Sequence, residues 1–260
     1  MHERVDLPTG PWQAGSPGPL RSVLVRAVGD ADDEFLLESA ELPPFARADA
    51  LLARCVDGIE VGTLTVGDRD ALLLHLRRLT FDERLECVLH CPVPDCAEAI
   101  ELELRVSDLL VAPPADAAPT HIIRAGGVDV EFRLPRVGDL DALSAATEEA
   151  RAVELLDRCI VSPVPMPKEA RDAVIDAMAE HDPQAELELE ITCPTCEREF
   201  MALFDCASFL LEELDRRAHQ LLREVHSLAR HYHWAEREIL ALPAQRRARY
   251  LDLIAGGTGT

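Results

Sequence analysis

A short sequence occurs twice in this chain and sets the pattern for most of it. Residues 66–72 read VGDRDAL and residues 137–143 read VGDLDAL, identical at six of seven positions. Each copy carries carboxylates where the first turn of a helix would lie, and the helix dipole favours negative charge there. We therefore expect both copies to begin helices and to belong to a duplicated unit.

A pair of cysteines follows each copy, flanked by alternating apolar and polar residues. The cysteines and their flanking segments are Cys91 and Cys96 between residues 85–90 and 100–104, and Cys193 and Cys196 between residues 187–192 and 200–203. Such alternation on both sides of a short turn is typical of a β-hairpin. Both copies thus predict helix, strand, cysteine turn, strand and helix. The second copy is longer by 31 residues, and its extra segments 152–160 and 167–179 look helical.

The four cysteines of these turns have the residue type and spacing of a structural zinc site. Cys193 and Cys196 form a C-x2-C turn, from which two thiolates can hold one zinc ion, and Cys91 and Cys96 form a looser C-x4-C turn. Four sulfur ligands fill the tetrahedral coordination of zinc and leave no position open for water. The expected metal is therefore structural and not catalytic.

Other roles for the cysteines remain open at this point. The two turns could hold reduced cysteines without metal, and Cys87 or His90 could replace one of the four ligands. The remaining cysteines, Cys55, Cys159 and Cys206, fall on apolar helical faces, so we expect them in the core. Disulfides are not expected, because thiols stay reduced in the cytoplasm, where we expect this chain to reside.

The charge of the chain argues against several classes of function. It has 26 Lys and Arg against 48 Asp and Glu, a net charge of -22, whereas binding to nucleic-acid phosphates needs a basic surface. No apolar run approaches the roughly 18 residues of a membrane span, and the first residues lack the apolar stretch of a signal peptide. We expect a cytoplasmic protein that binds neither nucleic acid nor membranes.

Motifs of common enzymes are absent from the sequence. It contains no P-loop, no dinucleotide-binding glycine pattern, no G-x-S-x-G and no H-E-x-x-H. His219 and His226 fall seven residues apart on a predicted long helix, and His231 and His233 lie at its end, where histidine complements the helix dipole. We therefore expect no catalytic residues and a protein that is not an enzyme.

The C-terminal part predicts a long helix with one apolar face. From residue 211 to 232 the apolar positions step by three and four, which is typical of a helix that packs against another helix. That other helix could belong to the same chain, to a partner or to a second copy. The expected partner-binding residues are Leu211, Leu214, Leu221, Val225, Leu228 and Tyr232, with Arg246 and Arg247 in a last helix after Pro243.

The chain divides into four parts. We expect residues 1–20 to be a disordered, Pro- and Gly-rich lead-in, and residues 21–120 to contain a β-hairpin that turns at Gly29 and Asp30, helices and the first cysteine turn. Residues 121–204 would contain the second repeat, its helical insertion and the second cysteine turn. Residues 205–260 would contain the long helix and a helical hairpin. The predicted fold class is α+β: duplicated units of a helix plus a zinc-knuckle β-hairpin, with a helical insertion and a helical C-terminus.

Several of these segments resemble a known family. LTVGDRDALLL at residues 64–74, CP at 91–92, CPTC at 193–196 and LLREVH at 221–226 are similar to T-even-type phage baseplate hub assembly proteins and their relatives in phage-tail-like contractile injection systems. Similar proteins usually carry C-P-x-C-G in both turns, whereas here Ala97 and Glu197 follow the cysteine pairs.

The resemblance implies a non-enzymatic, baseplate-associated or assembly-chaperone protein whose partners are hub or spike proteins of a contractile particle. Two alternatives come from other classes. A zinc-ribbon regulatory or adaptor protein unrelated to tails would share the cysteines, although a DNA-binding regulator would need a basic face. A metal-dependent hydrolase would need an open coordination position on the metal, which four cysteines do not leave.

Overall fold

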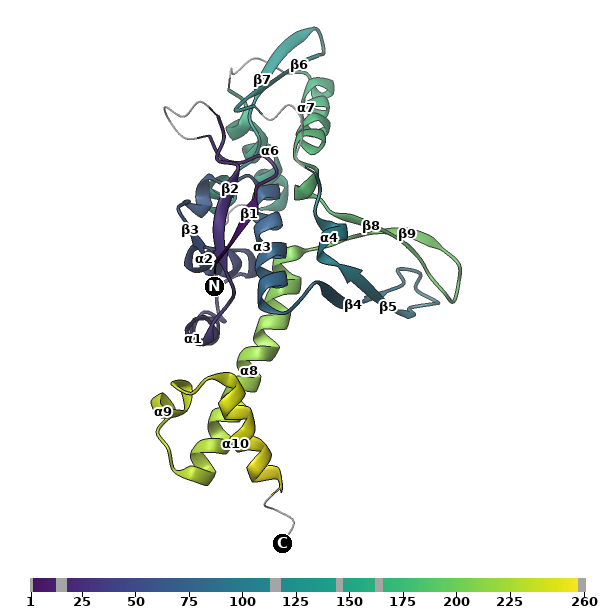
Figure 1. Cartoon of the computed structure of the whole chain (residues 1–260). Coiled ribbons are helices and arrows are strands. Elements are labelled where there is room, and N and C mark those ends of the chain that lie inside the picture. Colours follow the sequence, from purple (N-terminus) through teal and green to yellow (C-terminus); the bar gives the residue numbers. More distant parts are fainter. Residues whose placement is uncertain (1, 13–17, 113–117, 144–146, 162–165, 257–260) are drawn as a thin grey trace.

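The computed structural model describes residues 2–12, 18–112, 118–143, 147–161 and 166–256 (Figure 1). In chain order its elements are β1 (His2–Asp6), β2 (Ser22–Arg26), α1 (Asp30–Glu38), α2 (Pro44–Cys55), β3 (Val56–Asp57), the 3-10 turn η1 (Val61–Thr63), α3 (Val66–Thr80), β4 (Arg84–His90), β5 (Ala99–Arg105), α4 (Val106–Leu109), β6 (His121–Ala125), β7 (Val128–Phe132), α5 (Val137–Ala142), α6 (Glu148–Cys159), α7 (Lys168–His181), the 3-10 turn η2 (Pro183–Ala185), β8 (Glu188–Thr192), β9 (Glu199–Leu203), α8 (Cys206–Tyr232), α9 (Glu236–Leu240) and α10 (Ala244–Gly256).

The main core lies between a small antiparallel sheet, in the order β1-β2-β3, and the helices α1, α2, α3 and the first half of α8. Leu51 and Leu52 of α2, Leu72 and Leu76 of α3 and Leu214 of α8 are fully buried there. Burying one such side chain stabilises the fold by about 1.5 to 3 kcal/mol. The first half of α8 is therefore an integral part of the body.

The N-terminal segment is more ordered than its composition suggests. Residues 1–20 were expected to be disordered, but β1 pairs antiparallel with β2, so that Val5 lies opposite Val23. Backbone N–H groups of Thr9 and Gly10 donate to the buried carboxylate of Asp68 at 2.9 and 2.8 Å. This expectation is wrong for residues 2–12, because long-range pairing orders them; residues 13–17 lie outside the described part of the chain.

The expected hairpin after residue 21 is also wrong in its second half. The segment after Gly29, which the sequence predicts as the second strand of the hairpin, forms helix α1 instead. Asp32 accepts the backbone N–H of Gly29 at 2.9 Å and so caps the start of α1, and three aspartates occupy the first turn. Acidic residues at a helix start outweighed the strand-like run of apolar residues that follows.

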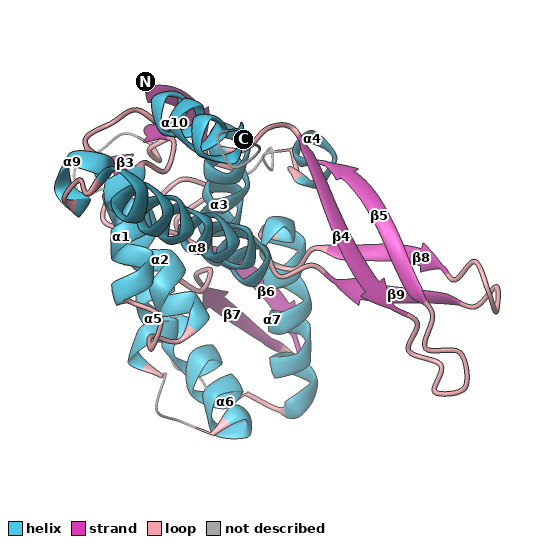
Figure 2. Ribbon diagram, turned by 90° about the horizontal axis from the view of Figure 1, so that it is seen from below, coloured by secondary structure: helices cyan, strands magenta, loops and turns pink. Residues whose placement is uncertain are grey.

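The two cysteine-bearing hairpins were correctly predicted. Strands β4 and β5 pair antiparallel, as do β8 and β9, and both hairpins project together from one side of the helical body (Figure 2). Their facing sides are apolar and pack on one another through residues that include Ile100, Leu102, Ile191 and Phe200. We call this pair of hairpins the arm.

Beyond the body, helices α6 and α7 cover the hairpin β6-β7 (Figure 1). Val130 and Phe132 of β7 and Val174 of α7 are completely buried in this second core. The helices expected at residues 152–160 and 167–179 are confirmed by α6 and α7. Both copies of the seven-residue repeat also begin helices, but α3 has 15 residues and α5 has six.

The long C-terminal helix is confirmed as α8, which runs from the body to a C-terminal unit that has its own apolar core with α9 and α10 (Figure 1). Leu221, Val225 and Leu228 on its second half pack with Ile239 of α9. In the described part of the chain, no helix combines the length and the apolar character needed to cross a membrane.

Candidate metal centre

The tips of the two hairpins bring four cysteines together. The Sγ atoms of Cys91, Cys96, Cys193 and Cys196 all lie within 4.8 Å of one another. Cys91 Sγ is 3.7 Å from Cys196 Sγ, and Cys96 Sγ is 3.7 Å from Cys193 Sγ. The predicted pairing of a C-x4-C turn with a distant C-x2-C turn is therefore present in the fold.

These distances fit a tetrahedral metal site. Four sulfur atoms bound to zinc at about 2.3 Å stand about 3.8 Å apart at the corners of a tetrahedron, whereas a disulfide needs about 2.05 Å. All eight cysteines of the chain are free thiols. The donor set is thus a cluster of four cysteine sulfurs that could hold a metal ion.

Each cysteine turn is closed by backbone hydrogen bonds. The N–H of Cys91 donates to the carbonyl of Glu98 at 2.9 Å, and the N–H of Cys193 donates to the carbonyl of Arg198 at 3.0 Å. The residue after each pair adopts the left-handed conformation, with φ of 46° at Ala97 and 56° at Glu197. Glycine would adopt this conformation without strain, so both turns carry a local backbone cost.

Backbone groups also favour the thiolate form of one ligand. Hydrogen bonds from the backbone N–H of Cys196, and further from that of Thr195, lower the pKa of Cys193 to about 7. Cys193 is completely buried and Cys91 nearly so, while Cys196 is exposed. A thiolate is the form that binds metal, so this turn favours the metal-binding form of Cys193, whereas desolvation and the neighbouring thiols raise the pKa of Cys96 to about 12.

The other candidate ligands lie outside this cluster. Cys87 belongs to the inner face of β4, and His90 is exposed at the end of the same strand. The expectation that Cys55, Cys159 and Cys206 are core residues is confirmed, since all three are buried. Burial raises the pKa of Cys55 to about 12 and that of Cys159 to about 11.

The residues expected to bind a partner mostly pack within the chain. Leu211 and Leu214 belong to the main core, and Leu221, Val225 and Leu228 to the core of the C-terminal unit. Arg247 is buried and pairs with Glu224 of α8 at 3.1 Å and with Asp30 of α1 at 2.9 Å. Tyr232 and Arg246 each contact Tyr250. Partner binding through this unit stays a prediction.

A polar link that gave no sequence signal joins the two halves of the chain. Asp182, after α7, accepts the N–H of Gly67 at the start of α3 at 3.0 Å. Gln184, which is fully buried, accepts the N–H of Val111 at 2.7 Å and donates to the carbonyl of Leu109 at 3.2 Å. From sequence alone, HDPQ at residues 181–184 predicts no more than a turn.

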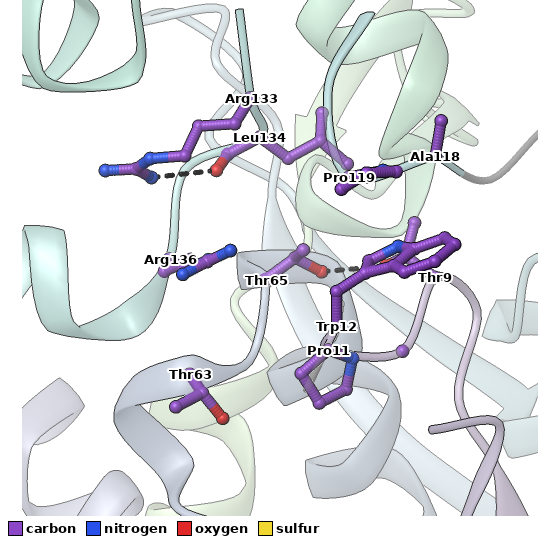
Figure 3. Close-up of a pocket in the computed structure, with 11 residues that line it drawn as sticks. Thr9, Pro11, Trp12, Thr63, Thr65, Ala118, Pro119, Arg133, Leu134 and Arg136 are labelled. Atoms are coloured by element: carbon purple, nitrogen blue, oxygen red, sulfur yellow. Dashed lines mark hydrogen bonds between the residues drawn. The ribbon is translucent and has the colours of Figure 1, made fainter. Parts of the chain in front are cut away.

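A small cavity lies where the N-terminal segment meets the loops before α3 and α5 (Figure 3). Trp12, Thr65 and Arg136 line it, and the hydroxyls of Thr9 and Thr65 are hydrogen-bonded at 3.0 Å. Its volume of about 30 Å³ is that of about one water molecule. The cavity is a packing feature of the junction and not a ligand site.

The fold and site define a mixed α+β protein with β-hairpins that meet at a four-cysteine cluster. Residues 44–162 match the family model described as T4 bacteriophage base plate protein, a structural family that is generally non-enzymatic. The expected resemblance is thus confirmed over that segment, which contains Cys91 and Cys96 and ends before the second cysteine turn. No curated protein and no solved structure matches this chain.

Proposed function

We propose that the protein is a non-enzymatic baseplate-associated or baseplate hub assembly protein of a phage-tail-like contractile particle, with zinc as a structural cofactor. The match over residues 44–162 is the observation that carries the proposal. The partners would be hub or spike proteins, and the work would be done in the cytoplasm. The four-cysteine cluster and the negative net charge agree with a protein that acts by binding other proteins.

In this proposal Cys91, Cys96, Cys193 and Cys196 hold the metal ion and thereby lock the two hairpins of the arm together. A bound zinc ion supplies tetrahedral cross-linking and no open position for chemistry. Each hairpin has only two strands, and an isolated hairpin is marginally stable. Metal binding would therefore fix the shape of the arm that partners meet.

We further propose that the chain arose by duplication. The two repeats align differently from what the seven-residue repeat indicates, with α1 corresponding to α5 instead of α3 to α5. Arg26 bonds Asp32 at 2.6 and 3.1 Å and the carbonyl of Arg54 at 2.8 Å. Arg133 bonds Asp139 at 2.6 and 2.8 Å and, in the same way, the carbonyl of Arg158 at 3.1 Å. Arg26 is the last residue of β2 and Arg133 directly follows β7, and each aspartate lies in the first turn of the next helix and caps its start.

The order of elements supports this register. ARADALLARCV at residues 46–56 matches ARAVELLDRCI at residues 150–160 in seven of eleven positions, so α6 corresponds to α2. It follows that α7 corresponds to α3 and that the arm contains one hairpin from each unit. The segment that looked like an insertion in the second copy would then be its regular pair of helices.

Fractionation by size of a lysate from the native host tests the assembly role. Quantitative mass spectrometry would follow this chain beside sheath and hub proteins. We expect it to travel with completed particles at fixed stoichiometry if it is a component, or with small hub subassemblies if it is a chaperone. Travel with neither would contradict the proposal and favour an adaptor protein unrelated to tails.

A further inference from the structure

An apolar groove lies beside strand β9 and between helices α6 and α7, outside the four-cysteine cluster. Its volume is about 470 Å³, within the range of about 300 to 1,000 Å³ that is usual for ligand pockets. The large apolar side chains that line it are Leu140, Leu155, Leu156, Ile175, Met178 and Leu203. Helices α3, α5, α6 and α7 supply most of its lining residues.

Two of its large apolar side chains are open to solvent. Ile175 is 52% exposed and Leu203 is 65% exposed, although both line the same groove. Met201, two residues before Leu203 and therefore on the same face of β9, is 54% exposed. Isolated apolar side chains are common on protein surfaces, but a continuous group of this kind marks an interaction site.

A buried carboxylate lies at the edge of this apolar surface. Asp182 lines the groove and is 4% exposed. Its Oδ2 atom accepts the N–H of Gly67, while its Oδ1 atom is buried and has no hydrogen-bond partner among the described residues. The Oδ1 atom lies against the backbone of Gly67 and is withdrawn from solvent, so Asp182 belongs to the junction with α3, and an occupant would meet the apolar side chains beside it.

The charge around the groove selects a positively charged occupant. Residues 148–203 carry fourteen Asp and Glu against five Lys and Arg, a net charge of -9. Glu186 lines the groove itself, and Glu188 lies directly opposite Leu203 in the strand register. A second copy of this chain, with its own charge of -22, would be repelled, whereas a cationic segment would be attracted.

We propose that this groove binds a cationic amphipathic helix of another protein, with apolar side chains in the groove and Lys or Arg side chains toward its acidic rim. Helices bind grooves in this way through apolar residues spaced three and four apart. The apolar surface continues past the groove to Met201, which suits an extended segment better than a small molecule. The statement that the other protein belongs to a baseplate rests on the proposed function. The chemistry of the groove is independent of the proposed function.

Titration of the full chain with synthetic 18-residue peptides tests this proposal. One peptide has Leu and Lys at helical spacing, a second has the same composition in scrambled order, and a third replaces Lys by Glu. Affinities would be measured by fluorescence anisotropy at 0.15 M salt, and hydrogen exchange would locate the footprint. We expect the first peptide to bind at least tenfold more tightly than the others and to protect α6, α7 and β9.

Substitutions separate the groove from general attraction to an acidic protein. Ile175→Asp and Leu203→Asp, at exposed positions that tolerate a polar residue, should each weaken binding of the first peptide at least tenfold. Val88→Asp, at a position 56% exposed on the other hairpin, adds the same charge and should leave binding within twofold.

Equal effects of Val88→Asp and Leu203→Asp, or equal binding of the scrambled peptide, would overturn the proposal. So would a wild-type dimer that Leu203→Asp converts to monomer in sedimentation, because the occupant would then be a second copy. A negative peptide result would leave the co-fractionation test of the assembly role unchanged, so the two failures can be told apart.

Discussion

The Sγ atoms of Cys91 and Cys196 lie 3.7 Å apart, although 105 positions separate the two residues in the chain. The second contact, between Cys96 and Cys193, also joins one hairpin to the other. A metal ion at this place would cross-link the two proposed repeats and not merely close each turn. Because binding of structural zinc is worth about 10 to 16 kcal/mol in small domains, the ion would determine whether the arm forms.

Replacing one ligand should therefore release the metal and loosen the arm. We expect Cys193→Ser to lose the bound zinc and to lower the free energy of unfolding by several kcal/mol, about the scale of breaking a buried charged pair. Metal analysis and chemical denaturation measure both effects. Cys87→Ser, on the same arm and outside the cluster, is the matched control. Loss of zinc in the control as well would contradict the assignment of ligands.

The left-handed residues of the cysteine turns should be improved by glycine. Ala97 and Glu197 have φ of 46° and 56°, a conformation that costs other residues about 1 to 2 kcal/mol and glycine almost nothing. We expect Ala97→Gly and Glu197→Gly each to raise the free energy of unfolding by about 0.5 to 1 kcal/mol. In contrast, Ala99→Gly, within strand β5, should lower it by a similar amount. Denaturant titrations decide the sign.

The sequence was most informative where a local pattern determines structure. The stepping of apolar residues from Leu211 to Tyr232 correctly predicts a long helix, and the C-x2-C turn with its alternating flanks correctly predicts the hairpin β8-β9. The four-cysteine cluster was also predictable, because few arrangements satisfy two such turns in one chain.

Features that depend on distant partners could not be predicted in this way. Strand β1 is ordered by its pairing with β2, and Asp182 is held by the N–H of Gly67, 115 positions away. The apolar residues after Asp33 suit a strand or a helix equally, and the packing of α1 on α8, with an ion pair between Asp33 and Arg217 at 2.9 Å, favours the helix. The seven-residue repeat aligns α3 with α5, whereas the pairs Arg26–Asp32 and Arg133–Asp139, which depend on the fold, suggest a different alignment of the two repeats.

The stability of the protein should fall as pH rises toward neutrality because of Asp182. Burial is the main cause that raises the pKa of Asp182 to about 7, and the neighbouring charges of Asp68 and Asp70 act in the same direction. Above about pH 4 the unfolded chain ionises this carboxyl, while the folded chain keeps it protonated up to about pH 7. The free energy of unfolding therefore falls as the pH rises between these two values.

Asp182→Asn removes this ionisation and keeps an acceptor for the N–H of Gly67. We expect the stability difference between variant and wild type to grow in favour of the variant from pH 5 to pH 7.5. Denaturation in saturating zinc at each pH measures it. A difference that is constant with pH would show that Asp182 is ionised in the folded protein.

The two arginine-aspartate pairs should respond alike to substitution. Asp32 is almost completely buried, and Arg26 and Arg54, with the N–H of Gly29, outweigh its desolvation and lower its pKa to about 2. We expect Arg26→Met and Arg133→Met each to cost about 2 to 4 kcal/mol, because each leaves a buried carboxylate short of a partner.

Arg124→Met is the control for these substitutions, since its pair with Asp129 is exposed on both sides. It should cost less than about 1 kcal/mol. Thermal denaturation of the three variants compares the effects. A large loss for only one of Arg26 and Arg133 would argue against equivalent roles in two repeats.

X-ray absorption at the zinc edge, on the full chain purified without added metal, tests the central claim most directly. We predict one zinc ion per chain with four sulfur neighbours at about 2.3 Å. Protein that contains no zinc, zinc with nitrogen or oxygen neighbours, or a disulfide between Cys91 and Cys196 would contradict the account.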